Sequence, residues 1–115
     1  MKNKKRVVFS FFTGLVLSVN ALVVSADANR SVGTIVTISN FEGHFGPLVK
    51  LSNMAPTEGS CPRNDWFILE ETHKFYDQNY SAILATKMAE REIVIISDEG
   101  DCVQNLPRLK HLYIP

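Results

Sequence analysis

Beyond residue 26, the chain has no cluster of basic side chains. Of the twelve lysine and arginine residues in the 115-residue sequence, four lie among the first six residues. The remaining eight are scattered among twelve acidic residues, which gives residues 27–115 a net charge of −4. Proteins bind DNA or RNA largely by neutralising phosphates with Lys and Arg. The sequence therefore predicts that nucleic acid is not a partner.

Motifs for catalysis or metal binding are also missing from the sequence. It has no glycine-rich phosphate loop and no serine nucleophile motif. The three histidines, His44, His73 and His111, are far apart, whereas zinc needs three or four converging ligands. The acidic turn at residues 97–101 lacks the spacing of a full calcium-binding loop. We expect no enzymatic activity, no metal site and no cofactor.

Residues 1–26 have the pattern of a secretory signal peptide. A basic start is followed by an apolar run over residues 7–24 and by small residues that end at Ala26. This order is typical of a cleaved export signal. We expect cleavage after Ala26, or alternatively after Ala28, which leaves no membrane span and places residues 27–115 in the periplasm or outside the cell. An uncleaved anchor is the rival interpretation, because the run is as long as the shortest spanning helix, roughly 17 residues.

The remaining residues, 27–115, are enough for one small domain. Only two cysteines are present, Cys61 and Cys102. In an oxidising compartment such a pair predicts one disulfide. Closing a loop of about forty residues stabilises a fold by roughly 4 kcal/mol, a large share of the stability of a small domain.

β-branched runs and helical spacing predict an α+β domain with the order β-β-β-α-β-β. We expect a small five-stranded, partly open barrel, OB-like, with one helix and one disulfide. An open antiparallel sheet with the helix across one face is the alternative. An apolar stripe of Tyr76, Tyr80, Ile83, Leu84 and Met88 predicts the buried face of the helix. The strands are expected at residues 32–38, 48–51, 66–69, 93–96 and 109–114, the helix at 77–91, and irregular structure at 103–107.

Several features follow one another over roughly the last sixty residues: Cys61-Pro62, Trp66-Phe67-Ile68, an alanine-rich helix at residues 80–85, the β-branched run 93–96, Cys102 and a final apolar strand. This order resembles a group of small exported bacterial proteins, largely uncharacterised, that are distantly similar to the B subunits of AB5 toxins. The resemblance implies an OB-like fold, assembly into a ring of identical subunits, and binding of glycans or a protein partner. No sugar-binding motif matches residue by residue, so the resemblance assigns no site.

The turn at residues 41–45 is the candidate ligand-binding site. Phe41 and Phe45 bracket Glu42 and His44, and both sugar rings and partner side chains stack on exposed aromatic groups. Alternatively, the two phenylalanines fold inward and anchor the turn. Trp66, like the tyrosines of the helix, is expected in the core.

These observations lead to two functional hypotheses that involve no catalysis. The first is a secreted or periplasmic binding module whose ligand is a glycan or a protein. One form of this hypothesis is a module that resembles a toxin B subunit. The alternative is a small inhibitor or immunity-type protein that caps an enzyme with the loop at residues 41–47 or 53–64. A hydrolase that uses Glu42 and His44 is the least favoured interpretation.

Overall fold

The structure, a computed structural model, describes residues 28–115. The signal peptide expected at residues 1–26 lies outside the described residues. Within residues 28–115, no helix has both the length and the apolar character needed to cross a membrane. The elements are β1 (Ala28–Ser39), β2 (Leu48–Leu51), the 3-10 helix η3 (Ala55–Thr57), β3 (Phe67–Ile68), α1 (Tyr76–Ala89), β4 (Glu92–Asp98), β5 (Cys102–Val103), β6 (Leu106–Pro107) and β7 (His111–Tyr113).

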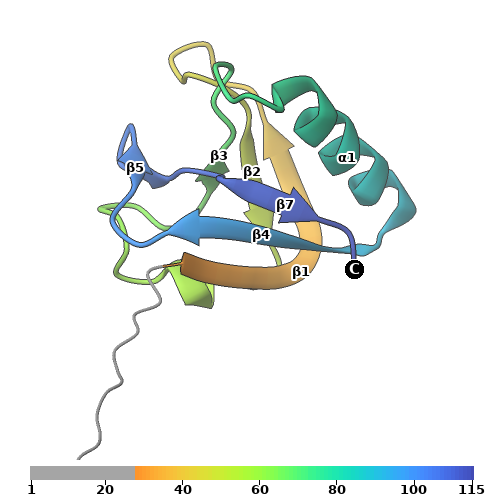
Figure 1. The fold of residues 1–115 in the computed structure, drawn as a ribbon, viewed down its shortest axis with the longest axis horizontal. Coiled ribbons are helices and arrows are strands. Elements are labelled where there is room, and N and C mark those ends of the chain that lie inside the picture. Colours follow the sequence, from red (N-terminus) through yellow and green to blue (C-terminus); the bar gives the residue numbers. More distant parts are fainter. Residues whose placement is uncertain (1–27) are drawn as a thin grey trace, which may run out of the picture.

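Five of the strands form one antiparallel sheet with the order β3-β2-β1-β4-β7 (Figure 1). The sheet is not closed, since β3 and β7 form its two edges. The α+β class and the one predicted α-helix are therefore confirmed within residues 28–115. β1 and β2 form an antiparallel hairpin.

The long strand β1 belongs to both halves of the sheet. Its residues 28–34 pair with β4, and its residues 35–39 pair with β2. The register shifts between Ile35 and Thr37, and a β-bulge of this kind bends a strand. Figure 1 shows β1 turning sharply along its length. The bend allows one strand to support two half-sheets that enclose a common core.

The core lies between the sheet and α1. Among the apolar side chains of α1, that of Ile83 is fully buried. The rings of Tyr76 and Tyr80 stack on each other and pack against the core. The predicted apolar stripe is wrong for Leu84 and Met88, whose side chains are 42% and 83% exposed. The helix rests on Ile83 and Thr86 instead. The main cluster consists of Ile35, Val49, Leu51, Phe67, Leu69, Ile83, Ile93, Ile95 and Leu109.

A short hairpin replaces the irregular structure predicted for residues 103–107. Cys102 pairs with Pro107 and Val103 with Leu106, so β5 and β6 are joined by a two-residue turn. The turn residues Gln104 and Asn105 have φ angles of 52° and 71°. Such left-handed turns usually contain glycine, and its absence here explains why sequence patterns missed the hairpin.

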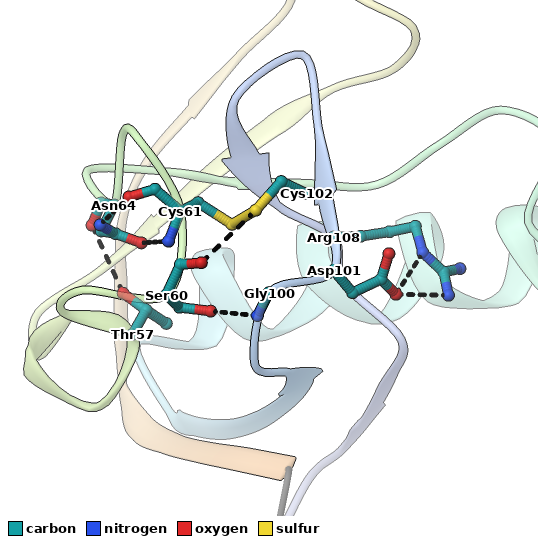
Figure 2. Close-up of a disulfide and its surroundings, with 8 residues drawn as sticks. All are labelled: Thr57, Ser60, Cys61, Asn64, Gly100, Asp101, Cys102 and Arg108. Carbon is teal, nitrogen blue, oxygen red and sulfur yellow. Dashed lines mark hydrogen bonds and ion pairs between the residues drawn. A yellow bond between two sulfur atoms is a disulfide. The ribbon is translucent and has the colours of Figure 1, made fainter.

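The predicted disulfide between Cys61 and Cys102 is confirmed. It joins two segments that are 41 residues apart in the sequence, the loop before β3 and the start of β5. Polar contacts reinforce this link (Figure 2). The amide of Asn64 bonds to both backbone groups of Cys61, and the hydroxyl of Ser60 accepts a hydrogen bond from the N–H of Gly100 at 3.0 Å. The loop before β3 is thus fixed to the end of β4.

Gly46 marks the closest approach between the β1–β2 loop and the segment that follows β3. The N–H of Leu69 donates to the carbonyl of Pro47 at 3.0 Å, and the N–H of Glu71 donates to the carbonyl of Phe45 at 2.9 Å. A Cβ atom at Gly46 would overlap the carbonyl oxygen of Leu69. Only glycine therefore fits between these two backbones.

We expect the substitution Gly46→Ala to lower the free energy of unfolding by about 1–3 kcal/mol, as overpacking does elsewhere. In a domain of this size, each kcal/mol lowers the melting temperature by roughly 4–8 °C. Gly43→Ala is the matched control in the same loop, because nothing lies within 4 Å of a Cβ atom there. Thermal unfolding followed by circular dichroism compares the two variants, and equal melting temperatures would contradict the predicted clash.

Candidate functional site

A hollow with a cavity volume of about 360 Å³ lies between the β1–β2 loop and the segment that leads into β3. It is open to solvent. The residues that line it are Phe41, Gly43, His44, Leu48, Arg63 and Trp66. Two loops that are distant in the sequence therefore form its walls, and the buried side chain of Leu48 in β2 lies beneath them.

The first wall is the tight turn at residues 41–45. The N–H of His44 donates to the carbonyl of Phe41 at 3.0 Å, and the two rings lie with their centroids 5.7 Å apart. The side chain of Phe41 is 54% exposed. This turn therefore presents an aromatic face to solvent at the edge of the hollow.

The second wall is the segment from Arg63 to Trp66. The N–H of Arg63 donates to the carbonyl of Asn105 at 2.9 Å, which attaches this segment to the β5–β6 turn. The ammonium of Lys50 lies 4.8 Å from the ring centroid of Trp66, a distance at which cation and ring attract each other. Arg63 and Trp66 thus bring a cationic donor group and a large ring to the same hollow.

His44 has a ring nitrogen without a hydrogen-bond partner in the described part of the chain. Its Nδ1 atom is buried, and no group among residues 28–115 bonds to it. A buried polar atom without a partner destabilises a fold.

The structure brings together only part of the predicted site. Phe41 and His44 line the hollow, whereas Glu42 and Phe45 belong to the same turn but are exposed and do not line it. Sequence patterns missed the three lining residues outside this turn, Leu48, Arg63 and Trp66. Trp66, which was expected in the core, is half-buried: it packs against the buried cluster that contains Leu48 and Ile68, and it also lines the hollow. Its position directly after a proline-containing loop is the signal that could have indicated this role.

None of the six described residues that line the hollow carries a carboxylate, whereas glycoside hydrolysis uses a pair of carboxylates on either side of the bond. Among residues 28–115, no group of three or more His, Cys, Asp and Glu side chains is arranged to hold a metal ion. The hollow offers rings, a guanidinium and backbone groups.

The guanidinium of Arg63 also contacts Asp65, at 2.8 Å. Both side chains are about half exposed. The hydrogen bond from Arg63 lowers the pKa of Asp65 below its ordinary value of 3.8. Because this pKa is lowered on folding, the contact stabilises the fold above pH 3.8, and this stabilisation is lost as the pH falls through the lower pKa of the folded state.

We expect the carboxyl group of Asp65 to titrate with a midpoint below 3.8 in the folded protein. Replacing Arg63 with Met, which has no N–H donor and no charge, removes the main cause of the shift, so the midpoint in Arg63→Met should rise towards the ordinary value. Carbon-13 NMR of the side-chain carboxyl groups, recorded from pH 2 to pH 6, measures both midpoints. The same midpoint in both proteins would show that the ion pair does not form in solution.

No protein-family model, no curated protein and no solved structure matches this chain. The hollow itself must therefore support any statement about function.

Proposed function

We propose that the protein is a non-enzymatic module that binds a glycan, with a sugar ring held in the hollow between Phe41 and Trp66. The observation that carries this proposal is that the two rings come from different loops yet line one hollow together with Arg63. The C–H groups of a sugar ring favour an aromatic face. Its hydroxyl groups need the donors that a guanidinium supplies.

The dimensions of the hollow agree with a small ligand. Small-molecule pockets usually measure about 300–1,000 Å³, and this hollow, at about 360 Å³, is near the lower limit. It has room for about one sugar ring, and its opening to solvent allows a longer glycan to extend outwards. We infer that the hollow holds a single sugar ring at the end or at a branch of an oligosaccharide, and that the rest of the oligosaccharide lies outside it.

We further infer that the fold is OB-like. An isolated parallel bridge joins Ile68 of β3 to Arg108, and the N–H of Leu109 donates to the carbonyl of Ile68 at 2.9 Å. This contact brings the segment before β7 beside the opposite edge strand, as in a partly open five-stranded barrel. OB-folds often bind oligosaccharides, which supports the proposed ligand and the resemblance to toxin B subunits. Assembly into a ring stays a prediction.

The disulfide supports a location outside the cytoplasm. Disulfides persist in oxidising compartments and are rare where thiols are kept reduced. We propose that the protein acts in the periplasm or outside the cell.

Trp66 is the single tryptophan of the chain and lies in the hollow, so its fluorescence reports binding directly. We expect oligosaccharides identified on a glycan array to change the emission of Trp66 in a saturable manner. The substitution Phe41→Ala should weaken this binding about twofold to twelvefold, because a stacked aromatic contact contributes roughly 0.5–1.5 kcal/mol. Fluorescence titrations with each glycan measure the dissociation constants.

Phe75→Ala is the matched control for this experiment. Phe75 is 51% exposed, against 54% for Phe41, but it does not line the hollow. The control should bind as the wild type does. The proposal fails if no glycan changes the emission, or if the two alanine variants weaken binding equally.

A second candidate function, the capping of a partner enzyme, is favoured by one observation. Phe45 is 59% exposed next to Phe41 on the same turn, and its backbone is held by hydrogen bonds to Gln104 and Glu71. Exposed aromatic residues on a fixed loop often dominate a protein interface. The partner enzyme would contact the outer surface of this turn rather than the hollow.

In affinity capture from native secreted protein, we expect the inhibitor hypothesis to yield one enzyme whose activity falls on binding. The substitution Phe45→Ala should weaken that complex by at least tenfold, because truncating an aromatic hot spot costs about 2 kcal/mol or more. Glycan binding by the same variant should be unchanged. An enzyme retained equally by Phe45→Ala would exclude this surface.

A further inference from the structure

The two-residue turn of the β5–β6 hairpin contacts both walls of the hollow. The side-chain Nε2 of Gln104 donates to the carbonyl of Gly43 at 2.9 Å, and its Oε1 accepts a hydrogen bond from the N–H of Phe45 at 2.8 Å. The next residue, Asn105, accepts the hydrogen bond from the N–H of Arg63 at 2.9 Å. One turn therefore holds the backbones of the two loops that carry the binding residues.

The backbone of Gln104 is unusual for a residue of its type. Its φ angle of 52° lies in the left-handed region, where glycine meets no steric penalty and other residues do. Glycine would therefore suit this position of the turn better, but it has no amide to bond to Gly43 and Phe45. The side chain of Gln104 thus makes two hydrogen bonds from a backbone conformation that is unfavourable for residues other than glycine.

The hairpin that carries Gln104 is itself firmly anchored. Cys102 at its base is joined to Cys61 by the disulfide. Leu106 is fully buried in a cluster with Leu48 and Ile68. After the hairpin, Arg108 forms an ion pair with Asp101 at 2.7 Å, and the hydrogen bond between them raises the pKa of Arg108 above its ordinary value. An amide presented from this hairpin can therefore hold the turn at residues 41–45 in place.

We propose that Gln104 is a positioning residue for ligand binding: its amide holds the turn at residues 41–45 at a fixed spacing from Arg63 and Trp66. This inference rests on the proposed function, since the ligand contacts come from the hollow. Without the amide, the turn keeps its internal hydrogen bond from His44 to Phe41 but loses two contacts with the hairpin. A ligand would then have to order the turn on binding, which lowers affinity.

The test uses two substitutions in the full domain, Gln104→Leu and Gln104→Gly. Leucine has a similar size but cannot form hydrogen bonds, and glycine removes the side chain while suiting the left-handed backbone. We expect hydrogen exchange at the N–H of Phe45, measured by NMR without ligand, to become at least tenfold faster in both variants. Glycan affinity, measured from Trp66 fluorescence, should fall about tenfold, while Gln104→Gly melts at or above the temperature of the wild type.

Asn105→Gly is the matched control, because the contact of Asn105 with Arg63 uses only its backbone carbonyl. It should leave both the exchange at Phe45 and the affinity unchanged. Unchanged exchange in both Gln104 variants would overturn the inference, as would accelerated exchange with undiminished affinity. If the wild type binds no glycan, the proposed function fails, and accelerated exchange in Gln104→Gly still supports positioning of the turn.

Discussion

The covalent link between Cys61 and Cys102 is the constraint on which the arrangement of the hollow depends. The segment between β2 and α1 has little regular structure, with a three-residue 3-10 helix and the two residues of β3. Few backbone ladders are therefore available to hold Arg63 and Trp66 in place. The disulfide, the amide of Asn64 and the bond from Arg63 to the β5–β6 turn supply this support instead.

The core and the hollow share the same strands. Val49 in β2 points into the main cluster, whereas its neighbour Leu48 is buried beneath the hollow and packs with Ile68 and Leu106. Because side chains alternate across a strand, β2 and β3 separate the stabilising core on one face from the site on the other. Changes to the exposed ring of Phe41 can therefore alter the hollow without disturbing the main cluster.

Local residue patterns predicted the parts of the fold that depend on local chemistry. The β-branched run in β4 and the pair of cysteines indicated a strand and a disulfide, and both are present. The β5–β6 hairpin depends on two non-glycine residues in left-handed conformation, for which the sequence has no signal. The exposure of Met88 and the placement of Trp66 at the hollow depend on how α1 and β3 pack in three dimensions. Spacing along the chain does not encode that packing, and the same limit hid Arg63.

The disulfide has a further consequence for the maturation of the molecule. It joins a segment before β3 to one after β4, so it cannot form until the helix and strand between them have been synthesised. A newly made, reduced chain would possess both loops but not the fixed geometry between them. Under the proposed function, the chain would therefore acquire its glycan-binding geometry only on oxidation, after synthesis of residue 102.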